Sequence, residues 1–213
     1  MRKVSRKQYF LTGSLLLVFS ILLSEKTAYS QSPLTNIVFY KVYNDFGVVS
    51  YAEQKGYLDE KIAESLLSPK LATDVKAAII NALSFEILGK DNSVRFIRFL
   101  KEKYKLENIE YHLDTLTADE LFCLGYLTVM DDYFVPEAGF PYFDKALQKN
   151  PKSFTIHTIY ALSMAQQLFL FDKCRAWKTV NNELTNPELT DLMLPEAIDL
   201  IRTFINVYSE DCP

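Results

Sequence analysis

The sequence has 213 residues, of which 49% are hydrophobic and 14% aromatic, and its formal net charge is −4 at pH 7. A chain of this length can form one domain that buries a sizeable core. A phosphate-backbone partner needs clustered Lys and Arg, and the acidic balance argues against one, so nucleic acid is excluded as an expected ligand.

The N-terminus has the order of a secretory signal peptide. Four basic residues among the first seven precede the apolar run SLLLVFSILL (14–23), and small residues follow at Ala28 and Ser30. The run is shorter than the roughly 20 residues that span a bilayer. We therefore predict a signal peptide over residues 1–30, cleaved after Ser30, with no stable membrane span afterwards. An uncleaved anchor that also uses residues 9–11 is the alternative.

Residues 31–213 are then expected to form a single all-helical domain. The first 30 residues carry five basic side chains and one acidic one, so their removal takes the net charge to −8. Because the signal directs the chain across a membrane, the expected location is a periplasm or an extracellular space.

The three cysteines leave at least one thiol unpaired in a monomer. Cys123 lies in the apolar stretch ELFCLGYL and is expected to be a small buried hydrophobe. A disulfide between Cys174 and Cys212 is an open alternative, because an exported chain can keep one but spacing alone does not bring the two Cα atoms together. No two cysteines are near in sequence, and the histidines are His112 and His157, so no metal site is predicted.

Hydrophobic spacing predicts helices through most of residues 31–116. The expected ranges are 35–46 and 47–56, separated at Gly47, followed by 58–67, 73–88 and 93–104. Thr73 or Asp74 is expected to cap the helix over 73–88, and Gly89 to end it. Residues 106–116 fit a short strand or an irregular connection about as well as a helix.

The pattern becomes sharper at Thr117. The stretch TADE is a capping box, in which the Thr117 hydroxyl accepts from the Glu120 amide and the Glu120 carboxylate accepts from the Thr117 N–H. A second helix is expected to end at Asn150. It either begins at Pro136 and bends at Pro141 or begins nearer Gly139.

Residues 117–208 resemble the tetratricopeptide repeat, a family of helical hairpins. The residues that carry the resemblance are Leu121, Leu124, Gly125, Gly139, Phe143, Ala146 and Pro151. The resemblance implies that the two glycines let antiparallel backbones approach, that Phe143 fills the space between hairpins and that Ala146 admits the next helix. Thr128 departs from the family, which usually has an aromatic residue there, and so does the short connection between the helices.

A fainter second copy follows. Ser153 is expected to cap its first helix, and Trp177 and Val180 take the places of Phe143 and Ala146, although Lys173 stands where the family has a small residue. A last helix begins at Pro195. A helix that caps a solenoid needs one apolar face towards the repeats. The apolar face of this helix comprises Ala197, Leu200, Ile201, Phe204 and Ile205.

The resemblance implies a protein or peptide partner held in a groove lined by the first helix of each hairpin. The groove positions would be Asp119, Phe122, Tyr126, Val129, Thr155, Thr158, Leu162 and Ala165. The alternative is that Phe122 and Tyr126 pack against the N-terminal helices. A further alternative is a structural subunit of a cell-envelope assembly, with its contact made by Ile37, Phe39, Tyr40 and Tyr43.

The sequence lacks a phosphate loop, a nucleophile elbow and a metal-binding helix motif. His157 is expected to be packed or on the surface, and Asp131 and Asp132 to lie in a loop of solvated acids. We therefore predict an all-α protein with hairpins stacked as a short tetratricopeptide-like superhelix. It is expected to be an exported, non-catalytic binding or scaffold module that uses no cofactor.

Overall fold

The prediction of an all-α fold is confirmed by a computed structural model that describes residues 32–86, 88–191 and 193–213. Within these ranges the chain forms nine α-helices and five 3₁₀ helices, and a single bridge between Ser153 and Thr190 is the sole β pairing. The predicted signal peptide lies outside the described residues, and the superhelical stacking stays a prediction.

The helices follow one another with short connections. The α-helices are α2 (Gly47–Lys55), α3 (Glu60–Leu67), α4 (Thr73–Ala82), α5 (Asn92–Tyr104), α6 (Ala118–Asp131), α7 (Phe140–Lys149), α8 (Phe154–Leu168), α9 (Lys173–Leu184) and α10 (Pro195–Asn206). The 3₁₀ helices are η1 (Phe39–Tyr43), η2 (Ile109–Tyr111), η3 (Leu113–Thr115), η4 (Pro136–Gly139) and η5 (Val207–Asp211).

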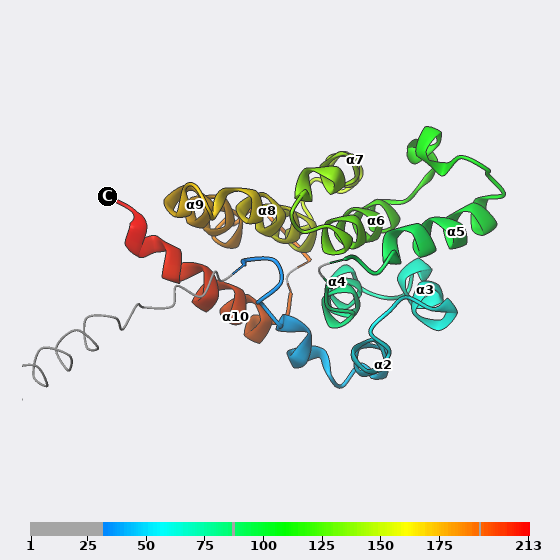
Figure 1. The fold of residues 1–213 in the computed structure, drawn as a ribbon, viewed down its shortest axis with the longest axis horizontal. Helices are drawn as coiled ribbons and strands as arrows, with labels where there is room; N and C mark the ends of the chain where they lie inside the picture. Colours follow the sequence, from blue (N-terminus) through cyan, green and yellow to red (C-terminus); the bar gives the residue numbers. More distant parts are fainter. Residues whose placement is uncertain (1–31, 87, 192) are drawn as a thin grey trace, which may run out of the picture. The chain divides into compact units, whose positions relative to one another are not determined.

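Residues 32–213 are arranged in two layers (Figure 1). Helices α6 to α9 lie side by side in one layer, and η1, α2, α4 and α10 lie beneath it. A continuous core of buried side chains runs from Leu34 to Tyr208 through both layers. Residues 32–213, which contain this core, form one compact unit.

The hairpin of α6 and α7 depends on two glycines, as the motif implies. A Cβ added at Gly139 would lie 2.7 Å from the Gly125 carbonyl oxygen, and one added at Gly125 would lie 3.2 Å from the Gly139 carbonyl oxygen. Phe143 is fully buried and stacks on Tyr160 of the next hairpin, with ring centroids 5.1 Å apart. The close approach and the role of Phe143 between the hairpins are therefore both confirmed.

Three segments differ from the sequence prediction or resolve its alternatives. The helix predicted over 73–88 is too long, because α4 ends at Ala82 and the chain turns at Ser84, whose φ is +60°. Residues 106–116 form the short helices η2 and η3. The second helix of the hairpin begins beyond Gly139, after the separate turn η4.

The predicted opening helix over 35–46 is also wrong, because only η1 forms there. The backbone N–H of Tyr40 donates to the Asn81 side chain at 3.1 Å, and the Asn81 amide donates to the Ile37 carbonyl oxygen at 3.0 Å. These long-range contacts hold the segment in an irregular path that hydrophobic spacing alone does not reveal.

The capping box at Thr117 is confirmed and belongs to a larger polar network. The Glu120 N–H donates to the Thr117 hydroxyl at 3.2 Å, and the Thr117 N–H donates to the Glu120 carboxylate at 2.8 Å. Lys103 and Tyr104 also donate to this carboxylate, at 2.6 and 2.8 Å. Burial by itself would raise the pKa of Glu120, but the hydrogen bonds from Lys103, Thr117 and Tyr104 outweigh burial and lower it.

The Glu120→Gln variant should lose about 2 kcal/mol of unfolding free energy near neutral pH, because charge-assisted hydrogen bonds disappear. The folded-state pKa of Glu120 lies below the ordinary value of 4.5. Its stabilising contribution is therefore complete above that value and is lost as the pH falls through the folded-state pKa. Urea unfolding of both proteins between about pH 6 and pH 3 should show the difference shrinking towards acid. A difference that stays constant with pH would contradict this account.

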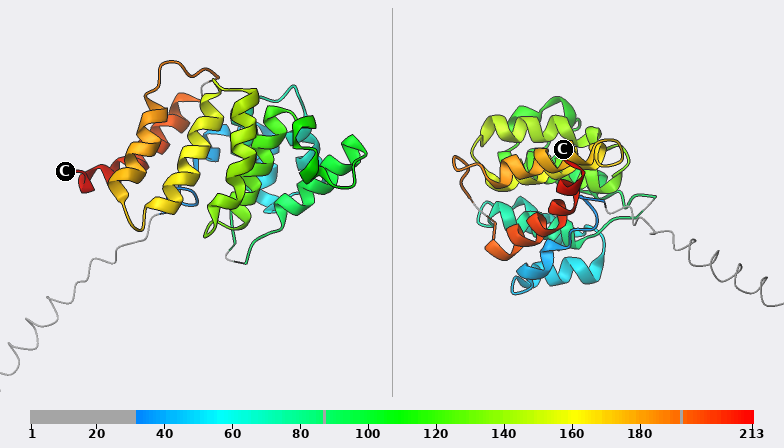
Figure 2. Two further views of the ribbon diagram at one scale, coloured as in Figure 1. Left: turned by 90° about the horizontal axis from the view of Figure 1, so that it is seen from above. Right: turned by 90° about the vertical axis from the view of Figure 1, so that its left-hand side faces the viewer.

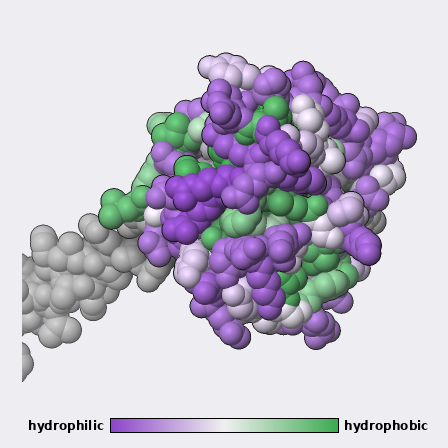
Figure 3. Space-filling view, turned by 90° about the vertical axis from the view of Figure 1, so that its right-hand side faces the viewer, coloured by the Kyte–Doolittle hydropathy of each residue, from purple (hydrophilic) through white to green (hydrophobic). Residues whose placement is uncertain are grey.

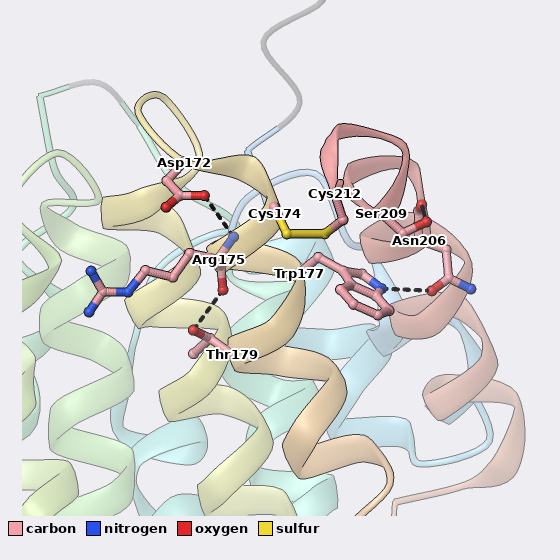
Figure 4. The surroundings of a disulfide bond; sticks show 8 residues. All are labelled: Asp172, Cys174, Arg175, Trp177, Thr179, Asn206, Ser209 and Cys212. Carbon is pink, nitrogen blue, oxygen red and sulfur yellow. Dashed lines mark hydrogen bonds between the residues drawn. A yellow bond between two sulfur atoms is a disulfide. The ribbon is translucent and has the colours of Figure 1, made fainter.

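The alternative of a Cys174–Cys212 disulfide is the one seen in the structure. The two Cα atoms lie 4.8 Å apart, and the bond joins the first turn of α9 to the residues after η5 (Figure 4). Beside it the Trp177 indole N–H donates to the Asn206 side chain at 3.2 Å. The C-terminal segment is thereby fastened to α9, and the remaining cysteine, Cys123, is buried as predicted.

Candidate binding surface

The residues predicted to line a partner groove lie in the interior. Phe122, Val129 and Thr158 have no exposed surface, and Tyr126 and Leu162 are 1% and 2% exposed. Thr155 and Ala165 are also fully buried. Asp119, which is half-buried, is the sole predicted groove residue with appreciable access to solvent.

The chain's own N-terminal segment and α4 fill the place of the groove. Asn81 of α4 donates to the Tyr126 hydroxyl at 3.3 Å, while also bonding to Ile37 and Tyr40. The hydroxyl of Ser32 donates to the Gln166 side chain of α8 at 2.5 Å. The burial of Phe122 and Tyr126 agrees with the predicted alternative, and the hydrogen bond from Asn81 joins Tyr126 to the N-terminal helices.

Asp119 accepts two hydrogen bonds from α4. The Thr73 hydroxyl donates to one of its oxygens at 2.8 Å, and the Lys76 ammonium group donates to the other at 2.5 Å. The Lys76 side chain is 2% exposed and that of Asp119 is 27% exposed. A buried cation needs such a partner, so the pair links the two layers of the fold.

The N-terminal residues considered for an assembly contact are interior too. Ile37, Phe39 and Tyr43 are at most 3% exposed, and Tyr40 is 9% exposed. The Tyr43 hydroxyl donates to Asp74 at 3.0 Å and accepts from the Leu194 N–H at 3.0 Å. These side chains join the N-terminal segment to the rest of the domain and are not available to another molecule.

The polar residues weighed for catalysis have structural partners. His157 contacts Glu183 at 3.2 Å and the Pro151 carbonyl oxygen at 3.0 Å. The Asp131 carboxylate accepts from the Asn92 N–H at 3.1 Å and from Ser93 at 2.7 Å. Burial raises the pKa of the Cys123 thiol, which disfavours a nucleophilic thiolate.

Two further features concern residues 32–86, 88–191 and 193–213. Within them, no helix combines the length and the apolarity needed to cross a bilayer. No group of three or more His, Cys, Asp or Glu side chains in those ranges is placed to hold a metal ion.

Exposed apolar side chains gather instead at one end of the molecule, which we call the apolar end surface. It comprises Leu88 (98% exposed), Phe171 (88%), Phe134 (68%), Leu170 (68%), Val94 (47%) and Val135 (43%). The connections between α4 and α5, α6 and α7, and α8 and α9, which carry most of these side chains, lie along the same lower side of the domain in the left-hand view of Figure 2. Apolar residues protrude on the left-hand side of the face shown in Figure 3.

Specific contacts hold the first two of these loops together. Gly89, with a φ of +75°, passes so close to Asp131 that an added Cβ would lie 2.9 Å from the Asp131 carbonyl oxygen. Phe85 packs edge-on against Tyr133, which stacks on Phe134. Leu88, Val94, Phe134 and Val135 surround an open depression of about 520 Å³ that Asp91, Asp131 and Asp132 also line.

The third loop joins α8 to α9 and presents Leu170 and Phe171. The N–H groups of Phe171 and Asp172 both donate to the Leu168 carbonyl oxygen, at 2.9 and 2.8 Å, so the chain turns tightly. Phe169 is buried in the core, while the two residues after it, Leu170 and Phe171, face solvent. Helix η4 packs against α8, and Gln167 donates to Glu137 at 3.5 Å, so this loop adjoins the one that carries Phe134.

Sequence reasoning missed this surface in part because it placed Leu88 on a helix. The helix predicted over 73–88 extends to Leu88, whereas α4 ends at Ala82. A usable signal was the stretch LFLF (168–171), in which four consecutive apolar residues cannot all face one side of a helix.

Comparisons of the chain with models of known protein families, with curated proteins and with solved structures found no match. The apolar end surface is therefore identified from the exposure and the positions of its residues.

Proposed function

We propose that the protein is an exported, non-catalytic binding module that attaches to a component of the cell envelope through its apolar end surface. The observation that carries this proposal is that six exposed apolar side chains lie on neighbouring loops, four of them around one depression and two on the adjoining loop between α8 and α9. Single exposed apolar residues are ordinary on soluble proteins, whereas a gathered set marks a contact surface.

Other features support a binding role. The resemblance of residues 117–208 to tetratricopeptide repeats favours an interaction module, and the residues weighed for catalysis are engaged in structural hydrogen bonds. The signal-like N-terminus and the disulfide between Cys174 and Cys212 favour an oxidising compartment outside the cytoplasm. The resemblance implied a protein or peptide partner, but such a partner has to use an exposed face, because the expected groove is filled.

The test is co-sedimentation of residues 31–213 with native envelope fragments, beside a Leu88→Ser/Phe171→Ser variant. Both side chains are almost fully exposed, so their replacement should leave the fold intact. The bound fraction should fall about tenfold, because each substitution removes apolar area from the contact. Tyr111→Ser is the matched control, since Tyr111 is 84% exposed and lies on η2, away from the apolar end surface.

Equal retention of the double variant and the unaltered domain would show that the apolar end surface is not the contact. Loss of retention in the Tyr111→Ser control as well would indicate a general effect of aromatic exposure. Either result would defeat the proposal.

A further inference from the structure

We propose that the apolar end surface rests on a lipid bilayer, with Leu88, Phe134 and Phe171 inserted at the boundary between head groups and acyl chains. This inference rests on the proposed function, in which the apolar end surface is the contact, and names lipid as the envelope component. Apolar side chains placed at that boundary gain free energy in proportion to the area removed from water.

The shape of the surface favours a soft layer over a folded ligand. Leu88 and Phe171 are 98% and 88% exposed, so they touch almost nothing of their own chain and stand out from it. Residues that form the walls of a peptide groove are normally half-buried by each other. Protruding tips on separate loops instead suit insertion into a layer that deforms around each of them.

The loops nevertheless have firm bases, so the tips hold their positions. Lys90 donates to the Leu83 and Gly56 carbonyl oxygens at 2.7 and 2.9 Å, which fastens the loop that carries Leu88. Asp172 accepts from the Arg175 N–H at 2.9 Å and caps α9 directly after Phe171. Loops whose bases are fixed in this way lose little backbone conformational entropy when their tips insert.

The chain enters the described domain near the loop that carries Leu170 and Phe171. Ser32 is fixed to Gln166, near the end of α8 and close in sequence to Leu170. The apolar run 14–23 ends nine residues before Ser32, a distance that an extended chain spans in about 30 Å. While that run lies in a bilayer, as a signal peptide before cleavage or as a retained anchor, this short length of chain limits how far Ser32 can lie from the bilayer.

The charges around the tips indicate that attraction to anionic lipid is not the driving force. Exposed acidic side chains at Glu86, Asp91, Asp132, Glu137 and Asp172 outnumber the exposed basic ones at Lys173 and Arg175. Binding should therefore be at least as strong on neutral phosphatidylcholine vesicles as on vesicles that contain anionic lipid. It should also persist at about 0.5 M salt, where the screening length is only a few ångströms.

The test is flotation of residues 31–213 with phosphatidylcholine vesicles. The partition coefficient of the Leu88→Ser/Phe171→Ser variant should be about tenfold lower, while Tyr111→Ser should match the unaltered domain. In a second measurement, tryptophan placed by Phe171→Trp should shift its emission to the blue on binding and be quenched by brominated acyl chains. Tyr111→Trp should show neither change, and Trp177 gives both proteins the same background.

Four results would overturn the lipid inference. Absence of vesicle binding, with envelope retention that still depends on Leu88 and Phe171, would make the component a protein and leave the proposed function standing. A dimer in sedimentation analysis that the double variant converts to a monomer would make the partner a second copy. Binding that needs anionic lipid and is lost in salt would show charge adsorption in place of insertion. Absence of both vesicle binding and envelope retention would defeat the proposed function as well.

Discussion

Gly139→Ala is expected to lower the unfolding free energy of residues 31–213 by about 3 kcal/mol or more, through overpacking at a helix crossing. The added Cβ would lie 2.4 Å from a methyl group of Val129 and 2.7 Å from the Gly125 carbonyl oxygen. The second contact is with backbone, so no side-chain rotation relieves it. Gly139 has φ −86° and ψ −17°, which alanine adopts readily, so the whole effect is steric.

Chemical denaturation measures this loss, and Gly47→Ala is its control. A Cβ at Gly47 meets nothing within 4 Å, and Gly47 begins α2. Alanine there should change the unfolding free energy by less than about 1 kcal/mol, in the stabilising direction. Similar stability of the two variants would mean that the backbones of α6 and α7 do not approach as closely as described.

Asp119→Ala is the second substitution with a large expected effect, again a loss of about 3 kcal/mol. It leaves the ammonium group of Lys76 buried without its carboxylate, because the Lys76 side chain is only 2% exposed. The reverse change, Lys76→Met, should cost less. Asp119 keeps its hydrogen bond from Thr73 and has some access to water.

A double-mutant cycle separates the pair from its surroundings. Lys76→Met in the Asp119→Ala background should recover most of the stability lost by Asp119→Ala, since no buried charge then remains. Urea unfolding of the four proteins at one pH gives the coupling free energy. Strictly additive losses would show that the ion pair contributes nothing to the contact between α4 and α6.

Local signals in the sequence predicted much of the second half of the chain. The capping box at Thr117 and the glycines at positions 125 and 139 act through contacts a few residues away or across one hairpin. Their consequences follow from the residue types alone. The all-α class was predictable for the same reason, since helical spacing is a local property.

Burial of the expected groove was not predictable in the same way. The irregular path of residues 32–43 depends on contacts such as that of Asn81 with Ile37, whose partners are 44 residues apart. The apolar end surface depends on where α4 ends, and that point is fixed by Ser84 turning at positive φ and by Lys90 binding the Leu83 carbonyl oxygen. Hydrophobic spacing assigns Leu88 to a buried stripe because it contains none of this information.

The segment that fills the groove also determines when the domain can finish folding. Its hydrogen bonds from Ser32 to Gln166 and from Leu194 to Tyr43 join residues 134 and 151 positions apart. Contacts of such long range form late, and a chain that is synthesised or exported from its N-terminus cannot form the second until Leu194 has emerged. Phe39 and Tyr43, which lie early in the described core, must wait for α10, so nearly the whole chain has to emerge before the core closes.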